Sequence, residues 1–444
     1  MGTWARRRLL QSAASAAGLA ATTGVPAWAP SGIRSGHDDV VERLRALPGL
    51  RVVEERPGAE PGHRFFVLGL RQPVDHRDPA AGTFEQRLLL LHTCADRPTV
   101  LFTTGYEAAL SPRRAEPTVL LGGNQLQVEH RYFGTSRPAA LDYRHLTVRQ
   151  AADDHHRVVR LFRAPYPGAW ISTGGSKGGM AGVHHRRFHP HDVDGTVAYS
   201  APNNVDDRDD SAHLRFLDTV GTAACRDALR TAQRQILLRR ADMAARYQAW
   251  AASTGTAFDL VGSADKALEI AVLRAAFMFW QKVPPRTALP FPARTRAPTR
   301  CTRGWTTPPH CPSTPTRWHG STSRTSTNSA RSSATWTCPP PIWPTCCATR
   351  MPCGPRTFVR RDIPMRFDSA AMPDSDHWVR RRGSRLLFVN GTEDPAVAES
   401  FHPDSPDSRV LWAPGATHHA TIGGLSTGDR AEAVALLTHW TAGS

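Results

Sequence analysis

A short apolar run that ends in a glycine-flanked serine is the feature that most constrains the fold of this chain. Residues 169–180 read Ala-Trp-Ile-Ser-Thr-Gly-Gly-Ser-Lys-Gly-Gly-Met, so Gly174, Ser176 and Gly178 form Gly-x-Ser-x-Gly ahead of a helical pattern at 180–188. In a nucleophile elbow, a tight turn between strand and helix holds such a serine in a strained conformation at the carboxyl end of a sheet. Glycines flank the serine because side chains there would collide with neighbouring backbone. The stretch therefore predicts a nucleophile elbow, although a glycine-rich loop can match five residues by chance.

Apolar runs and helical patterns alternate along the 444-residue chain, which is long enough to bury a large core. We expect strands at 65–68, 86–92, 99–102, 126–133, 171–174, 197–200, 385–391 and 409–412, turn residues at 72–79, and helices at 37–47, 147–162, 180–188 and 430–441. Helical spacing also runs from about 212 to 281. This order predicts an α/β fold, with a doubly wound, mostly parallel sheet and an inserted helical cap.

We expect the chain to divide into five segments. They are a signal peptide at 1–30, the first part of the α/β core at 31–205, a helical cap at 206–283, an acid-free segment at 284–357 and the second part of the core at 358–444. A cap of this kind restricts which substrates reach the nucleophile.

An acid and a histidine each follow one of the last two expected strands. Asp394 comes three residues after the first of these strands, and His418 comes six residues after the second. The chain order Ser176, Asp394, His418 is the order of α/β-hydrolase triads. In such a triad His418 takes the serine proton as general base, and Asp394 orients its ring and stabilises the imidazolium. The adjacent rivals for the two roles are Glu393 and His419.

Two backbone N–H groups are expected to bind the oxyanion of the reaction. The first belongs to Lys177, directly after the nucleophile, and the second to Gly105 or Tyr106, where a buried strand ends. One such donor is worth ~10² to 10³ in rate. A strand followed by glycine is common, so this expectation depends on the assignment of Ser176.

The N-terminus has the pattern of an export signal. Three arginines at 6–8 precede an Ala-rich stretch that runs to about residue 24, and Ala27-Trp28-Ala29 offers a cleavage pattern. Arg-Arg-x-Leu-Leu at 6–10 also fits a twin-arginine signal, while an ordinary basic n-region fits nearly as well. We therefore expect a secreted protein. No apolar run reaches the ~20 residues of a membrane span, so we expect no membrane association of the mature form.

The formal net charge of +16 suggests an anionic partner such as nucleic acid, but its distribution argues otherwise. No Asp or Glu occurs between residues 270 and 361, and the segment 284–357 holds ten Arg, fifteen Pro and six of the eight Cys. Without these ten arginines and the three at 6–8, the net charge is +3. A GC-rich reading frame translated out of register has this composition, so we predict a frameshifted, disordered insert at 284–357. Resequencing the gene tests this prediction.

Three other interpretations of 284–357 remain open. It could be a Pro/Arg-rich disordered linker, a segment that binds the cell wall, or a zinc or disulfide module. The cysteines of such a module would be Cys301, Cys311, Cys338, Cys346, Cys347 and Cys353. Their spacing includes no Cys-x2-Cys pair, which disfavours zinc.

Histidines gather in the first part of the core but do not predict a metal site. They are His155, His156, His184, His185, His189 and His191. No acid or cysteine at helical spacing accompanies them, so surface or packing roles are favoured. We expect neither a metal nor a cofactor.

Several stretches together resemble a known family, the secreted bacterial tripeptidyl and tetrapeptidyl aminopeptidases, which are serine peptidases that favour proline before the cleaved bond. The matching stretches are Gln-Pro-Val-Asp-His at 72–76, Glu-His-Arg-Tyr-Phe at 129–133, Thr-Gly-Gly-Ser-Lys-Gly-Gly-Met at 173–180, Asp394-Pro395 and the Pro-Gly-x-x-His run that ends at His418. The Glu-His-Arg motif is also similar to the lysosomal prolyl carboxypeptidase and dipeptidyl peptidase group.

The resemblance covers about residues 60–283 and 358–442, and it implies Ser176, Asp394 and His418 as the triad and Glu129 as a candidate substrate-binding residue. It also implies a cap that closes over the free N-terminus of the substrate. Thr417 departs mildly from the family, where Asn tends to precede the histidine.

The leading interpretation is a monomeric serine exopeptidase that releases tri- or tetrapeptides from free N-termini and prefers proline before the scissile bond. One alternative is a secreted esterase, because the triad chemistry serves esters equally well. Another is an inactive secreted protein that binds cell-wall polymer through its basic segment.

Overall fold

The computed structural model describes residues 40–442, except 59, 207, 284–362 and 364–367. The expected signal peptide at 1–30 and the acid-free segment at 284–357 thus lie outside the described residues.

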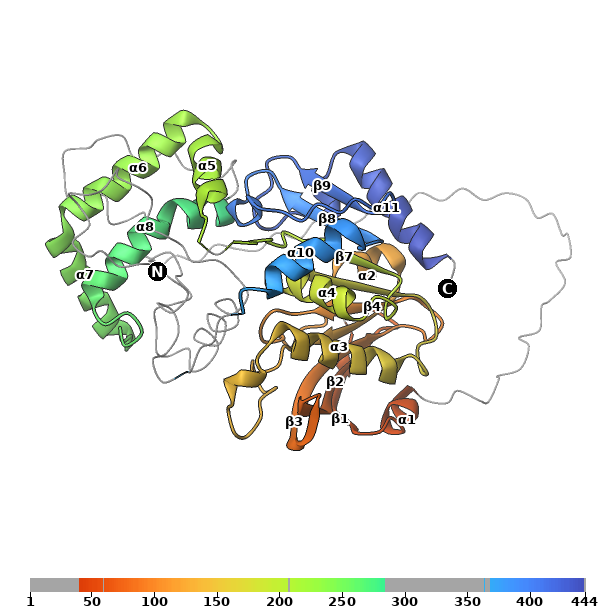
Figure 1. The fold of residues 1–444 in the computed structure, drawn as a ribbon. Helices are drawn as coiled ribbons and strands as arrows, with labels where there is room; N and C mark the ends of the chain where they lie inside the picture. Colours follow the sequence, from red (N-terminus) through yellow and green to blue (C-terminus); the bar gives the residue numbers. More distant parts are fainter. Residues whose placement is uncertain (1–39, 59, 207, 284–362, 364–367, 443–444) are drawn as a thin grey trace, which may run out of the picture. The chain divides into compact units, whose positions relative to one another are not determined.

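A nine-stranded sheet forms the centre of the core, in the order β1-β2-β3-β5-β4-β6-β7-β8-β9 (Figure 1). The strands are β1 (Leu50–Pro57), β2 (Arg64–Asp75), β3 (Asp78–His92), β4 (Thr99–Thr103), β5 (Asn124–Val128), β6 (Trp170–Gly175), β7 (Gly195–Tyr199), β8 (Leu386–Gly391) and β9 (Arg409–Ala413). From β5 through β9 each neighbouring pair is parallel, whereas β1, β2, β3 and β5 pair antiparallel. The mostly parallel sheet is confirmed.

The antiparallel end of the sheet differs most from the expected elements. β2 and β3 are far longer than the strands expected at 65–68 and 86–92, and they leave only residues 76 and 77 between them instead of a turn over 72–79. The outer half of β3 is exposed. This half of β3 pairs with β2 but does not pack on the core, so its sequence shows no apolar alternation.

Two expected boundaries also move. The strand expected at 126–133 ends at Val128, because Glu129 begins a buried loop whose carboxylate binds other backbone segments. The helix expected from residue 180 is α4 (Lys177–Phe188), which begins directly after Ser176.

Helices cover both faces of the sheet. α1 (Val40–Arg45) and α3 (Val148–Phe162) pack on one face through Leu44, Val158 and Phe162. α4 and α10 (Ala371–Arg381) pack against β7 and β8, while α11 (Thr427–Thr441) packs Leu437 and Trp440 against Ile171 and Val389 on the other face. α2 (Glu116–Leu121) contacts α11. This is the α/β-hydrolase fold that the sequence predicts.

An inserted set of helices follows β7. It consists of α5 (Ser211–Thr219), α6 (Ala223–Leu238), α7 (Arg240–Thr254) and α8 (Ala264–Lys282). The set has its own apolar cluster, which includes Leu237, Tyr247, Leu268 and Val272. Helical spacing from 212 to 281 is thereby confirmed. Within the described part of the chain, none of the helices is long and apolar enough to cross a membrane.

Candidate active site

Ser176 has the strained backbone of a nucleophile elbow. Its φ of 54° and ψ of −125° are unusual for a residue other than glycine, and its side chain is partly exposed between β6 and α4. The Ser176 N–H donates to the carbonyl of Tyr199 at 2.7 Å, and its own carbonyl accepts from Met180 N. The turn is thus fixed from both sides, and Ser176 lies at the carboxyl end of β6.

The flanking glycines of the elbow are required by close packing. A Cβ on Gly174 would come within 2.5 Å of the backbone carbon of Gly178, and a Cβ on Gly178 would come within 2.5 Å of the carbonyl oxygen of Thr103. Backbone atoms cannot move aside as a flexible side chain can. Any side chain at Gly174 or Gly178 would therefore collide with backbone, as the sequence pattern predicts.

The carboxylate and the imidazole expected in the triad meet past the last two strands. Asp394 Oδ2 and His418 Nδ1 are 2.7 Å apart, and Asp394 is fully buried. The other carboxylate oxygen of Asp394 accepts from Ala396 N at 3.0 Å. A buried carboxylate bonded to Nδ1 fixes the ring orientation and leaves Nε2 for another partner. Among the described residues, the rivals Glu393 and His419 form no such carboxylate–imidazole bond.

The loop after β4 packs against the start of α4. A Cβ on Gly105 would come within 2.6 Å of Lys177 Cβ, and the Thr103 hydroxyl lies 2.8 Å from the carbonyl of Gly178. Gly105, Tyr106 and Lys177 are therefore neighbours, as an oxyanion hole built from both segments requires. Their backbone N–H groups as oxyanion donors stay a prediction.

Glu129 lies in the interior, with no accessible surface. One carboxylate oxygen accepts from Ala108 N at 3.0 Å, and the other from Thr135 N at 2.9 Å and from Ser136 N at 3.1 Å. The Ser136 hydroxyl adds a further bond at 2.8 Å. These contacts tie the loop after β4 to the loop after β5. The substrate-binding role expected of Glu129 stays a prediction, and the contacts give it a structural role that the sequence did not reveal.

Arg131, the arginine of the Glu-His-Arg motif, binds a second set of backbone segments. Arg131 is fully buried and binds both carboxylate oxygens of Asp154, at 2.7 and 2.8 Å. It also donates to the carbonyls of Val74 and His145. Burial alone would raise the pKa of Asp154, but the charge and hydrogen bonds of Arg131 and His76 outweigh it and lower this pKa to about 2.

Three residues come close enough to hold a metal ion, namely His156, His189 and Asp192. The expectation of no acid at helical spacing is wrong, because Asp153 precedes His156 by three residues on α3. Asp192 lies beyond this helix, and its approach to His156 depends on the fold. Each imidazole is already bonded to a carboxylate, at 2.8 Å, and the two rings stack at 4.0 Å with an interplanar angle of 11°. Stacked parallel rings direct their in-plane lone pairs alongside one another instead of toward one ion. The contacts therefore describe histidines that are hydrogen-bonded to carboxylates.

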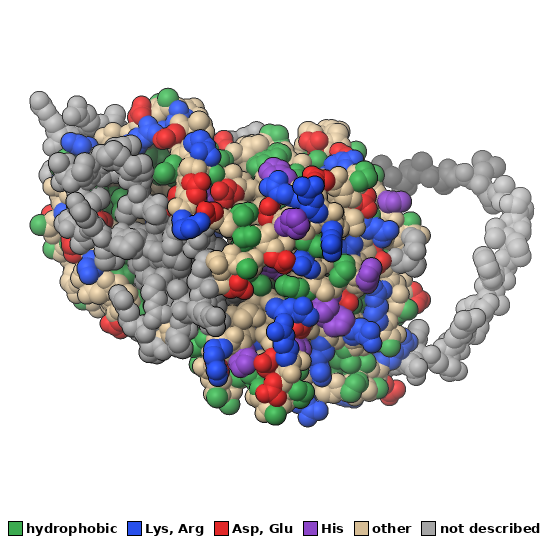
Figure 2. Space-filling view, viewed as in Figure 1, with side chains coloured by type: hydrophobic (Ala, Val, Ile, Leu, Met, Phe, Trp, Pro, Cys, Tyr) green, Lys and Arg blue, Asp and Glu red, His purple; other side chains and the backbone are tan. Residues whose placement is uncertain are grey.

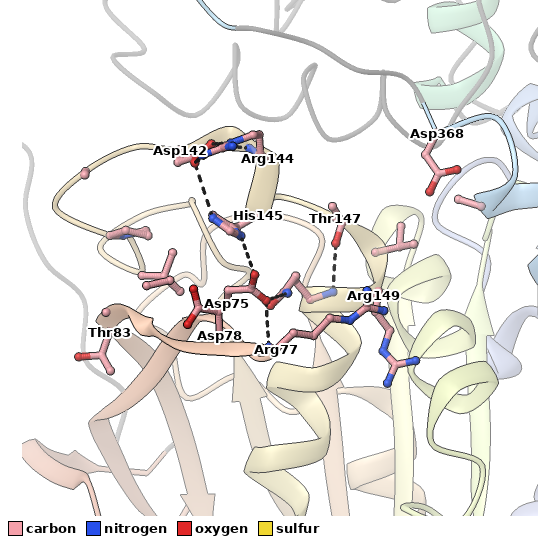
Figure 3. Close-up of a pocket in the computed structure, with 18 of the residues that line it drawn as sticks. Asp75, Arg77, Asp78, Thr83, Asp142, Arg144, His145, Thr147, Arg149 and Asp368 are labelled. Atoms are coloured by element: carbon pink, nitrogen blue, oxygen red, sulfur yellow. Dashed lines mark hydrogen bonds and ion pairs between the residues drawn. The ribbon is translucent and has the colours of Figure 1, made fainter.

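A cavity of about 1080 Å³ opens between the β2–β3 turn and the start of α3 (Figure 3). Neither Ser176 nor Asp394 nor His418 lines it. Its polar groups bind one another: Asp75 accepts from Gln150 Nε2 at 2.5 Å and from Arg77 N at 2.9 Å. We therefore assign it no part in catalysis.

The space-filling view shows acidic and basic side chains interspersed over one face of the described residues (Figure 2).

A strained serine after a parallel strand, with a carboxylate–histidine pair after the last two strands, is the arrangement of serine hydrolases with the α/β-hydrolase fold. The chain belongs to the family described as PS-10 peptidase S37, whose model matches residues 35–444, and it is accordingly a serine peptidase.

The chain is also similar to individual known proteins. The chain is 39% identical over 423 residues to the prolyl tri/tetrapeptidyl aminopeptidase of Streptomyces mobaraensis, which covers 92% of this chain and 86% of that protein. It is 32% identical over 181 residues to the lysosomal Pro-X carboxypeptidase of Homo sapiens, or 36% of each chain. A solved proline iminopeptidase from Mycobacterium smegmatis is 14% identical, with a TM-score of 0.38 over 84% of this chain and 98% of that one.

Proposed function

We propose that this protein is a secreted prolyl tri/tetrapeptidyl aminopeptidase, which removes short peptides from free N-termini and prefers proline before the scissile bond. The observation that carries the proposal is the buried Asp394–His418 bond of 2.7 Å in a chain whose elbow serine is Ser176. Its likeness to the Streptomyces mobaraensis enzyme, at 39% identity over 92% of the chain, supplies the substrate class.

In the proposed mechanism the hydroxyl of Ser176 attacks the carbonyl carbon of the proline residue. His418 Nε2 accepts the hydroxyl proton and then returns it to the leaving amine, while Asp394 holds Nδ1 and stabilises the imidazolium. The backbone N–H groups of Lys177 and of Gly105 or Tyr106 stabilise the oxyanion of the tetrahedral intermediate. Water then attacks the acyl-enzyme, His418 accepts the proton of the water and passes it to the leaving oxygen of Ser176, and the peptide departs with a free carboxylate.

The helices after β7 are proposed to limit the substrate to short N-terminal segments. The end of α8 lies beside the proposed base, because the carbonyl of Gln281 accepts from His418 N at 3.2 Å. α8 also contacts the short 3-10 helix Pro395–Val397, which begins directly after Asp394. A cap in this position can exclude a long chain on the N-terminal side of the substrate.

The test is hydrolysis of a chromogenic tripeptide with a free N-terminus and a C-terminal proline, by the full chain and by Ser176→Ala. We expect turnover by the full chain, none by Ser176→Ala, and loss of turnover when the substrate N-terminus is acetylated. Equal turnover of the acetylated substrate would overturn the exopeptidase assignment. Faster turnover of a short-chain ester than of any peptide would favour an esterase.

A second experiment distinguishes a wrong peptidase assignment from a loss of activity caused by the segment at 284–357. A version of the gene with the reading frame restored across this segment is assayed beside the original. Activity in the restored version alone would support both the peptidase assignment and the predicted frameshift, whereas no activity in either would contradict the peptidase assignment.

A further inference from the structure

The side chain of Lys177 runs beneath the loop that follows β4. A Cβ built on Gly105 would lie 2.6 Å from Lys177 Cβ and 2.7 Å from its Cγ, so the methylene stem and this glycine are in direct contact. Farther along, Lys177 Nζ lies 5.4 Å from the ring centroid of Tyr106 and 5.3 Å from that of Phe133. These two rings meet edge to face, with centroids 5.7 Å apart. The stem and the amine thus contact both residues expected to supply the second oxyanion donor.

The amine of Lys177 is costly to bury in this place. Lys177 is 8% exposed, and its Nζ has no hydrogen-bond partner among the described residues. Lys177 lines a cavity of about 20 Å³ together with His130 and His184, and this cavity has room for about one water molecule. Burial lowers the pKa of this amine well below its ordinary value. The fold therefore keeps a polar end here at the expense of stability.

Truncating Lys177 would extend the cavity of about 20 Å³ toward Gly105 and remove the surface on which the Tyr106 ring rests. Glycine has the most backbone freedom of any residue, so the Gly105–Tyr106 peptide would then be free to move. A donor displaced from its position loses stabilisation in the transition state, where the oxyanion forms.

We propose that the side chain of Lys177 is a positioning residue, whose stem holds the Gly105–Tyr106 peptide in place as the second donor to the oxyanion. This inference rests on the proposed function. Lys177 acts on one oxyanion in two ways, directly through its backbone N–H and indirectly through the stem that supports Tyr106. Because the oxyanion develops in the transition state and is absent from the bound substrate, the stem affects kcat and leaves KM unchanged.

The experiment compares Lys177→Ala, which removes the stem, with Lys177→Met, which keeps a stem of similar length without the amine. The matched control is Lys266→Met, since Lys266 is partly buried at the start of α8. Each variant is assayed with the Pro-ending tripeptide, for inhibition by a peptide boronate whose tetrahedral adduct occupies the oxyanion hole, and for thermal unfolding.

We expect Lys177→Ala to lower kcat by about 10- to 100-fold at unchanged KM, which is less than the ~10² to 10³ lost with a whole donor. Boronate affinity should fall by the same factor. Lys177→Met should keep kcat within about 3-fold of the original and unfold at a higher temperature, because thioethers pack well on aromatic rings and need no desolvation of an amine.

Two results would overturn the inference. The first is a folded Lys177→Ala variant with the original kcat and boronate affinity, and the second is a Lys177→Met variant as slow as Lys177→Ala. Failure of the proposed function is distinguishable from both, because the original chain would then show no turnover of the tripeptide, or turnover would persist in Ser176→Ala.

Discussion

The substitution Glu129→Gln separates the two roles open to this buried acid. A glutamine is the same size, but one of its two acceptor oxygens becomes an NH2 group that can only donate. Among the described residues, Ala108 N and Arg87 Nη1 donate to one oxygen, while Thr135 N, Ser136 N and the Ser136 hydroxyl donate to the other. In either orientation, the NH2 group of the glutamine faces at least one buried N–H. The orientation with NH2 toward Ala108 leaves fewer donors without an acceptor.

A buried donor without an acceptor costs about 1–3 kcal/mol. We therefore expect Glu129→Gln to lower the free energy of unfolding by that amount. The loop with Ala108 also carries the proposed oxyanion donor, so kcat should fall while KM stays the same. Urea unfolding and steady-state kinetics measure both effects. Glu85→Gln is the control, because Glu85 forms only an exposed pair with Arg51 and such pairs contribute little. A raised KM at unchanged kcat and stability would refute this reasoning and assign Glu129 to the substrate ammonium.

Three further predictions concern the rest of the site and its support. Asp394→Asn should lower kcat at neutral pH by about 10⁴-fold, because the amide no longer enforces the productive histidine tautomer; a drop below tenfold, by steady-state kinetics, would contradict the triad. Gly178→Ala should abolish activity, since its Cβ would meet a β4 carbonyl at 2.5 Å, whereas Gly182→Ala, with a nearest contact of 3.4 Å, should remain active. Arg131→Met should lower the free energy of unfolding by about 3–5 kcal/mol, because it leaves a buried carboxylate without its cation. In the original chain the pKa of Asp154, lowered to about 2 from 3.8, adds stability above pH 4 that is lost as the pH falls toward 2, and acid unfolding curves should show this loss.

The residues of the proposed triad could be predicted because their signals are local and ordered. Gly174, Ser176 and Gly178 fall within five positions, and Asp394 and His418 each come a few residues after an apolar run. In a parallel sheet, the carboxyl ends of the strands meet at one edge, so the order of the strands predicts that Ser176 lies at the edge where Asp394 and His418 bond.

The remaining features depend on contacts between distant segments. The apolar signal of β1 is short, because only Leu50 and Val52 of this strand pack against the core and most of its other residues are exposed. The carboxylate of Glu129 is charged and would be expected on a surface, yet its partners lie 6 to 42 residues away in the chain. Nothing in a single sequence indicates that backbone N–H groups from two loops converge on one side chain.

The loop after β4 is held from three sides, and this has a consequence for how substitutions combine. The Thr104 hydroxyl lies 2.8 Å from the carbonyl of Tyr106, the Glu129 carboxylate binds Ala108, and the Lys177 stem contacts Gly105. A donor fixed in this way needs no reorganisation when the oxyanion forms, which is the source of its effect on rate.

Supports of one loop are coupled, so their loss should not be additive. Once Lys177→Ala has released the loop, Glu129→Gln has less order left to destroy. The double variant should therefore lose less kcat than the product of the two single losses, while the losses in unfolding free energy should add more nearly. Multiplicative losses in kcat would mean that Glu129 and Lys177 act on separate parts of the reaction, and the common loop would then not be their link.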